Sequence, residues 1–357
     1  MNKETDGLEG VIAARTVISH ADGEHGKIWV RGVPIDQVVT RGFEGAVALL
    51  WEGFVGQGLS GRGALCELGK GRALAFSRLA GWLPAAKNKQ VTEALRVALA
   101  ALPDDSTPSG IAGMLPVVIA ALLRTEGGQE PLPPDPSLGT AEDFLRMWHG
   151  RAVEPSLIAA LDRYLTTVID NGLGSSAFAG RVIISTGASL AAAVTGAYAA
   201  FTGPLHGGAP SLALDMLDAI AASQDVDDWF DRRLAGGERL IGFGHRVFRR
   251  RDPRADILRA AVRELAPSNA RLAFAQDVER RALAALKRRK PGRSIEANIE
   301  IDAAILLEAM GVPRHAFTPV FAMGRAPSWI AHALEQKRSG RMIRPTSLYV
   351  GELHSEI

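Results

Sequence analysis

The chain has 357 residues, of which 47% are hydrophobic and 22% charged, so it is an ordinary globular protein with room for two domains or one large domain and a smaller lobe. Lysine and arginine total 41 against 39 acidic residues, and this net charge of +2 argues against a general affinity for nucleic acid or an anionic membrane. The single cysteine, Cys66, allows no intramolecular disulfide and favours a reducing, cytoplasmic compartment.

The N-terminal part of the chain predicts a small β-hairpin. The first ten residues, MNKETDGLEG, lack the basic and apolar regions of a secretory signal. Between residues 11 and 35, two β-prone runs flank the turn-forming pair Asp22-Gly23. Almost everything after this hairpin has the pattern of helices.

Two segments in the middle of the chain bear on its organisation. Residues 125–140 are rich in proline and glycine, which predicts a surface loop or linker between helical blocks. The longest apolar region, Ser189 to Phe201, is too short and too rich in Gly, Ser and Thr to span a bilayer. We interpret it as a buried helix.

Helical periodicity is clear in the last third of the chain. Apolar residues recur at helical spacing in residues 257–265, before Pro267, and in residues 303–310, before Gly311. The basic run of residues 287–290 falls at a predicted helix C-terminus, where cations interact favourably with the helix dipole. We interpret it as a solvated helix end rather than a nucleic-acid site.

Two histidines lie in glycine-rich surroundings that differ from a core position. His206 lies in GPLHGGAPS and His245 in IGFGHRVFRRRDPR. A histidine beside Gly207 and Gly208 lies where backbone can approach a ligand closely, although spacing alone leaves a structural role equally open.

The segment around His245 combines groups suited to an anionic ligand. Gly242 and Gly244 supply flexible backbone, His245 a proton donor, and the arginines at 249, 250, 251 and 254 supply guanidinium forks. This predicts a site for a phosphorylated cofactor or a carboxylate substrate. We set a metal site aside because the sequence has no HExxH, no paired histidines at helical spacing and no cysteine cluster.

Both histidine segments, together with FAMGRAPSWIAH and RPTSLYVGE, resemble the signature segments of citrate synthases. LEGVIAARTVIS and KIWVRGVPI are similar to that family's opening hairpin, and FLRMWHG to a mid-chain segment. The likeness covers nearly the whole chain in order. It implies an all-α, two-domain helical fold with a small N-terminal β-hairpin, in which residues 1–206 and 307–357 form a large domain and residues 207–306 a small one.

The resemblance also implies a reaction. Members of this family condense an acyl-CoA with a 2-oxo acid and hydrolyse the thioester, as homodimers without a metal or a cofactor beyond the CoA thioester. His206 would hydrogen-bond the thioester oxygen and stabilise the enolate, while His245 would polarise the 2-oxo carbonyl and protonate the alkoxide. Domain closure would exclude water, with hinges near His206 and Glu300.

Three arginines match the family's contacts with substrate carboxylates: Arg254, Arg325 and Arg344, the last of which acts across the dimer. The apolar helix predicted at residues 189–201 would also need a cover, so we expect an obligate dimer.

The CoA site is implied by a second set of matches. Arg249 matches a contact with a CoA phosphate. The backbone of four consecutive residues would line the adenine site, namely Ile241, Gly242, Phe243 and Gly244.

One departure from the family pattern concerns the catalytic base. The family's aspartate lies in a segment like PNVDF, and the aligned residue in ANIEIDAAILLEAMG is Glu300, which we expect to act as the base. Asp302 would share the face of Glu300 in an extended chain, but would point about 200° away from it in a helix.

A second departure concerns the substrate pocket. Citrate synthases carry a segment like LHADHGLNAST where this chain has TVIDNGLGSSAF, so two histidine positions are lost, to Val168 and Asn171. Asn171 can donate a hydrogen bond to a carboxylate or carbonyl, but it cannot be cationic.

Three functions follow as alternatives. The first is a citrate synthase that uses acetyl-CoA and oxaloacetate, and the second is the same chemistry on another acyl-CoA or 2-oxo acid, as in 2-methylcitrate synthases. The third is a non-catalytic CoA-binding paralogue. Retention of both histidines and of the arginine set argues against the third, since a scaffold has no need of a carboxylate clamp.

Overall fold

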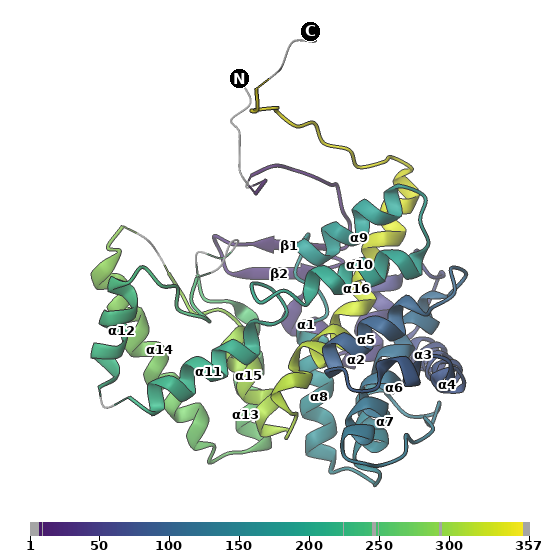
Figure 1. Ribbon diagram of the computed structural model, residues 1–357, viewed down its shortest axis with the longest axis horizontal. Helices are drawn as coiled ribbons and strands as arrows, with labels where there is room; N and C mark the ends of the chain where they lie inside the picture. The colour runs from purple at the N-terminus through teal and green to yellow at the C-terminus, as the bar shows by residue number, and fades with distance from the viewer. Residues whose placement is uncertain are drawn as a thin grey trace.

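Helices make up almost the whole protein, and the described residues contain one small three-stranded sheet (Figure 1). The computed structural model describes residues 7, 8, 10–223, 225–244, 248, 250–292 and 295–352. Its helices are α1 Ile35–Val39, α2 Gly42–Trp51, α3 Gly61–Ser77, α4 Leu79–Ala86, α5 Val91–Ala100, α6 Pro108–Glu126, α7 Thr140–His149, α8 Pro155–Thr167, α9 Ser175–Ser185, α10 Leu190–Phe201, α11 Ala209–Ala221, α12 Val226–Ala235, α13 Pro253–Leu265, α14 Ala270–Arg289, α15 Glu300–Ala309, the 3-10 helix η1 Arg314–Ala316 and α16 Phe317–Ser339. The predicted all-α fold is confirmed.

The sheet contains the predicted hairpin. Its strands pair antiparallel in the order β1 Ser19–Asp22, β2 Lys27–Val30 and β3 Val33–Pro34. Asp22 faces Lys27, and its carboxylate accepts hydrogen bonds from the backbone of residues 24 and 25, which closes the turn. Gly26, at a φ of +65°, brings this turn against the segment before α13, since a Cβ there would lie 3.2 Å from the carbonyl oxygen of Arg251.

The longest apolar helix is α6, so the prediction that residues 189–201 are the longest apolar region was wrong. Among the described residues, α6 alone is long and apolar enough to cross a membrane, but 72% of its apolar window is buried inside the protein. A helix that is apolar on all sides and buried by its neighbours is a core helix.

The apolar segment at residues 189–201 forms the buried helix α10, as predicted. Ser189 caps it by accepting a hydrogen bond from the backbone of Ala192. Helices α5, α9 and α16 already pack against α10. These helices cover part of α10, while Ala199 and Ala200 are exposed, so the expectation of an obligate dimer stays a prediction.

Small residues let α3 and α6 approach at backbone distance. A Cβ on Gly71 would lie 2.0 Å from the carbonyl oxygen of Ser109, and one on Gly113 would lie 2.8 Å from the backbone of Gly71. Beside this contact, the fully buried Arg72 donates to Asp143 of α7 at 2.8 Å. Helices α6 and α7 thus belong to one block, and the proline-rich segment between them is a surface loop.

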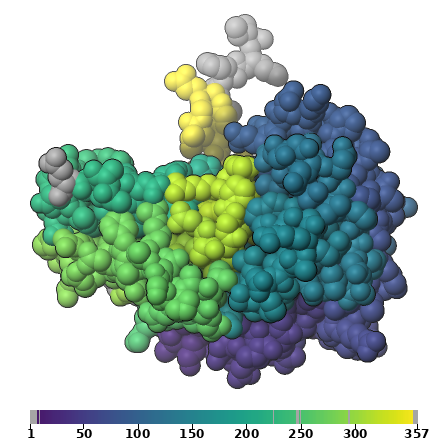
Figure 2. All heavy atoms as spheres, turned by 90° about the horizontal axis from the view of Figure 1, so that it is seen from below, coloured from purple at the N-terminus to yellow at the C-terminus, as the bar shows by residue number. Residues whose placement is uncertain are grey.

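Helix α16 lies at the centre of the fold and packs against helices from across the chain (Figure 1). Its Trp329 is buried, and Trp51 of α2 donates its indole N–H to the carbonyl oxygen of Pro327 at 3.0 Å. In Figure 2 the yellow-green part of the chain lies between the green helices and the blue and teal helices. Residues on α16 can therefore meet side chains from both parts of the molecule.

Helices α11 to α15 gather on one side of the molecule, with α12 and α14 farthest from α6 and α7 (Figure 1). Within this group α13 packs against α15, and it also contacts α8. The predicted periodic helices are confirmed, since α13 ends at Leu265 and α15 at Ala309. The basic run closes α14, as predicted. The domain boundaries at residues 207 and 306 stay a prediction.

Two arms leave the helical body on the same side (Figure 1). Residues 11–18, before β1, and residues 340–352, after α16, form neither helix nor strand. Both arms carry large apolar side chains in the open, and Ile12 and Val350 are 88% and 89% exposed.

The close contact of α3 and α6 predicts the effect of one added methyl group. Gly113→Ala should lower the free energy of unfolding by about 2 kcal/mol, because two rigid backbones must separate to admit a Cβ. Gly81→Ala is the matched control on the exposed face of α4, where nothing lies within 4 Å of the added atom. It should raise the stability by about 0.5 kcal/mol through helix propensity. Equal changes in urea denaturation of the two variants would contradict this account.

Candidate active site

The carboxyl group of Glu300 lies at the start of α15. The helix begins at Glu300, whose backbone N–H donates to Asn298 Oδ1 at 2.9 Å. Its side-chain Oε2 accepts from the backbone N–H of Gly242 at 3.1 Å. Burial raises the pKa of this carboxyl above its ordinary value, although the Gly242 and Asn298 hydrogen bonds and the charge of Arg254 oppose the shift. The helical start also resolves the direction of Asp302, which turns away from Glu300 to pair with Arg259.

The four predicted adenine-site residues form a turn and an isolated β-bridge beside Glu300. Gly244 N–H donates to the Glu296 carbonyl at 2.8 Å, and Asn298 N–H donates to the Gly242 carbonyl at 2.9 Å. These two bonds flank the antiparallel pair of Phe243 and Ala297. In such a pair the N–H and C=O of Phe243 point away from the segment that carries Ala297.

The glycines of this segment are required by its geometry. Gly242 and Gly244 have φ angles of +84° and +83°, which only glycine adopts readily. A Cβ on Gly242 would also lie 2.6 Å from Ile301 Cγ1. The remaining two residues, Ile241 and Phe243, are partly buried.

His206 lies in the turn between α10 and α11. Its Nε2 is 2.9 Å from Ser176 Oγ, which accepts the indole N–H of Trp329 at 3.1 Å. The indole N–H can only donate, so Ser176 accepts from it and can donate its own hydroxyl proton to Nε2. With Nε2 as the acceptor, the proton of the neutral imidazole lies on Nδ1. Burial, with the charge of Arg325 adding to it, lowers the pKa of His206 to about 4. At neutral pH this histidine is therefore an uncharged hydrogen-bond donor.

Arg325 projects from α16 into the same region. Its Nε donates to the Val168 carbonyl at 2.7 Å, and its guanidinium lies 5.1 Å from the centre of the Phe321 ring. Burial lowers the pKa of Arg325 to about 10, against the opposing charge of Asp170. The group is still cationic at neutral pH, and it is only 5% exposed.

Arg254, near the start of α13, is the second buried guanidinium. Its Nε and Nη2 donate to the two carboxylate oxygens of Asp252, at 3.0 and 2.6 Å. This pairing leaves Nη1 without a partner among the described residues. The charge of Arg254 is felt by both Glu300 and Arg325, so the structure brings these three predicted residues together.

A buried polar chain supports the pocket from behind. Arg181 donates to His332 Nδ1 at 3.1 Å, so the proton of a neutral His332 lies on Nε2, which donates to Asp170 Oδ1 at 3.2 Å. Burial would raise the pKa of Asp170, but the His332 hydrogen bond and the charge of Arg325 hold it well below its usual range. The next residue, Asn171, has a buried Oδ1 to which no described residue donates.

Of the predicted residues that the structure describes, Arg344 is not brought to this place. Arg344 is exposed on the C-terminal arm, which leaves the end of α16 and projects from the body (Figure 1). The backbone of neighbouring Ile343 is held there by Ser185 Oγ at 3.0 Å. The predicted contacts of His245 and Arg249 lie outside the described residues.

Sequence reasoning missed two residues that orient the catalytic groups. Ser176 lies 30 residues before His206, and no periodicity connects the two. Asn298 holds the start of α15 and donates its amide to the Gly244 carbonyl at 3.2 Å. A capping type of residue two positions before Glu300 is the signal that could have found it.

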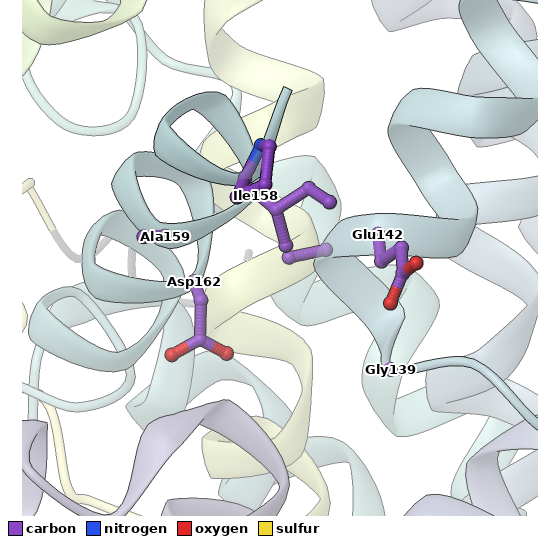
Figure 3. Close-up of a pocket in the computed structure, with 7 residues that line it drawn as sticks. Gly139, Glu142, Ile158, Ala159 and Asp162 are labelled. Carbon is purple, nitrogen blue, oxygen red and sulfur yellow. The ribbon is translucent and has the colours of Figure 1, made fainter. Parts of the chain in front are cut away.

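A separate pocket of about 320 Å³ lies between α7 and α8 (Figure 3). Its lining combines Glu142 and Asp162 with the apolar Ile158 and Ala159. Asp162 accepts from the backbone N–H of Phe43 at 3.0 Å, and burial raises its pKa to about 6. None of the predicted site residues lines this pocket, so it lies outside the candidate active site.

The groups around Arg254 define a class of protein. A desolvated carboxyl, a neutral histidine donor and two buried guanidinium forks are the parts of an enzyme that removes a proton from one substrate and binds the carboxylates of another. In the described part of the chain, no three His, Cys, Asp or Glu side chains are placed to hold a metal ion.

Comparison with known proteins identifies the family. The family model described as "Citrate synthase, C-terminal domain" matches residues 7–346. The citrate synthase of Acidithiobacillus ferridurans is 32% identical, over 97% of this chain and 95% of its own length. The 2-methylcitrate synthase of Mycobacterium tuberculosis is 29% identical, over 97% and 90%. The citrate synthase of Thermoplasma acidophilum, in a ternary complex with carboxymethyl coenzyme A and oxaloacetate, matches with a TM-score of 0.86 and 25% identity over 98% and 97%. This chain belongs to the citrate synthase family.

Proposed function

We propose that this enzyme condenses acetyl-CoA with oxaloacetate to give citrate and CoA. The observation that carries the proposal is a pair of buried guanidinium groups: the charge of Arg254 acts on the desolvated carboxyl of Glu300, and the charge of Arg325 acts on His206. Guanidinium forks bind carboxylates, and oxaloacetate carries two of them. The complex of the Thermoplasma relative with a CoA derivative and oxaloacetate supports the same pair of ligands.

The first step is removal of a proton from the acyl methyl group. Glu300 takes this proton, and His206 donates a hydrogen bond from Nδ1 to the thioester oxygen, where negative charge develops. The neutral state of His206 suits this role because its proton stays available throughout the working pH range. The longer side chain of glutamate is accommodated by the Gly242 hydrogen bond, which fixes where the carboxylate lies.

The second step joins the two substrates. The enolate carbon forms a bond with the 2-oxo carbon of oxaloacetate, held by Arg254 and Arg325, and the carbonyl oxygen takes a proton. We propose His245 as the donor of that proton, on its family position. Water then adds to the thioester, the C–S bond breaks, and citrate and CoA leave without any metal or further cofactor.

We place the adenine of CoA against the backbone of residues 241–244. The outward N–H and C=O of Phe243 support this, since an adenine edge offers both a donor and acceptors. Arg249 is proposed as a phosphate contact. This location lies next to Glu300, because Gly242 of the same segment donates to the Glu300 carboxylate.

A second substrate pair is favoured by one observation. Asn171 stands where the family carries a histidine, and its buried Oδ1 has no donor in the described structure, so the pocket wall differs in charge and in hydrogen bonding. The 2-methylcitrate synthase relative shows that the fold serves other acyl groups. Propionyl-CoA or a different 2-oxo acid is therefore the alternative.

Thiol release from a matrix of acyl-CoAs and 2-oxo acids tests the substrate assignment. We expect acetyl-CoA with oxaloacetate to give the highest kcat/KM, and Asn171→His to raise it further by restoring a donor that can carry charge. A higher value with another pair, weakened by Asn171→His, would establish the alternative. No thiol release with any pair would refute the proposed function.

Substitution of Glu300 tests its assignment as base. Glu300→Gln keeps size and polarity but removes the proton acceptor, so kcat should fall at least about a hundredfold with CoA affinity nearly intact. Because burial raises the pKa of Glu300, the wild-type rate should be lost on acidification at a pH above the ordinary glutamate range, and this acidic limb should vanish in Glu300→Gln.

Two further variants act as controls. Glu300→Asp should be slower if the pocket is built for glutamate, whereas a faster enzyme would show a weakened citrate synthase. If Glu300→Gln left turnover unchanged while Asp302→Asn abolished it, the base would be Asp302.

We also propose that the enzyme works as a homodimer. The exposed Arg344 cannot complete the site of its own chain from the projecting arm, and the apolar residues on both arms support a second copy as their cover. A cytoplasmic location is proposed as well, supported by the free, exposed thiol of Cys66.

Hybrid dimers test whether Arg344 acts across the interface. Arg344→Leu and Glu300→Gln should each be nearly inactive alone. In a mixed dimer, one of the two sites combines an intact Glu300 with an intact Arg344 from the other chain. Co-expression with random pairing should therefore restore about a quarter of the wild-type activity. No recovery in dimers shown to be mixed would mean that Arg344 serves its own chain.

A further inference from the structure

The second acidic residue of α15, Asp302, is held on the face of the helix opposite Glu300. Side chains two positions apart in an α-helix point in directions that differ by about 200°. The Asp302 side chain is almost fully buried, and both of its oxygens accept from Arg259, from Nε at 2.9 Å and from Nη2 at 3.0 Å. Such a two-point pairing fixes orientation as well as distance.

Two more charges complete this arrangement. Glu279 of α14 accepts from Arg259 Nη2 at 2.6 Å and from Arg251, whose guanidinium also lies 3.5 Å from Asp302. We call these residues the four-charge cluster: Arg251, Arg259, Glu279 and Asp302. Its two positive and two negative groups balance, so each buried charge has an opposite partner.

The cluster connects the two chain segments that carry the site. Arg251 is three residues before Arg254 and Arg259 is five residues after it, while Asp302 is two residues after Glu300. The backbone of Arg251 also lies against the hairpin turn at Gly26. The cluster thus fastens the start of α13, which presents a carboxylate-binding group, to the first turn of α15, which presents the base.

Few hydrogen bonds fix the rotation of the first turn of α15, although its Ile301 and Ala303 are buried in the core. Among the described residues, no side chain caps Ile299, the N-cap, and Asn298 alone binds the backbone N–H of Glu300. On its near face, a single hydrogen bond from Gly242 reaches the Glu300 carboxylate. A shift of about 1 Å in a catalytic group can cost roughly a hundredfold in rate, so a contact that prevents rotation of this turn has a direct bearing on catalysis.

We propose that Asp302 is a positioning residue: through Arg259 it prevents rotation of the first turn of α15 and so sets the position of the Glu300 carboxyl relative to Arg254. The catalytic part of this statement rests on the proposed function of Glu300 as base. The structural part, that Asp302 and Arg259 order this turn, stands independently of it.

The test compares Asp302→Asn and Arg259→Gln in the full-length enzyme with Arg280→Gln as a matched control. Arg280 forms an exposed ion pair with Asp277 on α14, the helix that carries Glu279. At a temperature well below unfolding, Asp302→Asn and Arg259→Gln should each lower kcat about tenfold with KM for both substrates within about threefold. The double variant should be no worse than either single one, because both remove the same contact. Arg280→Gln should leave kcat unchanged.

Hydrogen–deuterium exchange supplies a readout that does not depend on turnover. Peptides spanning residues 298–306 should exchange faster in both variants and at the wild-type rate in Arg280→Gln. Unchanged exchange there would overturn the proposal, whatever the activity. Faster exchange and a lower Tm with unchanged kcat would reduce Asp302 to a purely structural role. If Asp302→Asn fails to fold, Arg259→Lys keeps the charge but loses the fork, and the same outcomes apply to it. A wild-type enzyme without thiol release would refute the proposed function and leave the exchange result to decide the structural part.

Discussion

Arg254 and Arg325 bring two positive charges into the interior, where they are 1% and 5% exposed, and each acts on the other. Buried charges persist only when they are compensated: Arg254 forms an ion pair with Asp252, and Arg325 feels the charge of Asp170 while it donates to the Val168 carbonyl. Burial, with the charge of Arg325 adding to it, keeps His206 uncharged. The site therefore offers cationic forks to a carboxylate substrate and a neutral donor to a thioester oxygen, which are the two requirements of the proposed condensation.

The scaffold supplies these pairs from helices that are far apart in the sequence. Asp170 follows α8, while its partner His332 lies on α16, more than 150 residues later. Arg181 of a third helix, α9, donates to Nδ1 of His332. The proton of a neutral His332 therefore lies on Nε2 and points at Asp170. Central placement of α16 makes this possible, because it contacts both the N-terminal helices and α11. A substitution in this buried series of hydrogen bonds would leave charges unpaired, so the series stabilises the fold as well as the site.

Much of the architecture could be predicted from the sequence because it depends on local signals. The hairpin follows from Asp22-Gly23, and the ends of α13 and α15 from proline and glycine. The direction of Asp302 was left open, because it depends on α15 beginning at Glu300, and periodicity does not fix the first residue of a helix to within two positions. The role of Ser176 depends on a tertiary contact that no spacing reveals, and no local pattern gives the destination of Arg344. The apolar pattern of residues 189–201 predicted burial, but not that α5, α9 and α16 provide it.

The central claim is that Glu300 removes the proton that starts the reaction. Exchange of the acetyl-CoA methyl protons in D₂O, measured by mass spectrometry with an unreactive oxaloacetate analogue in the site, reports this step without condensation. The account predicts deuterium incorporation by the wild-type enzyme and at least about a hundredfold slower incorporation by Glu300→Gln, with CoA binding retained. Incorporation at the wild-type rate by Glu300→Gln would contradict it.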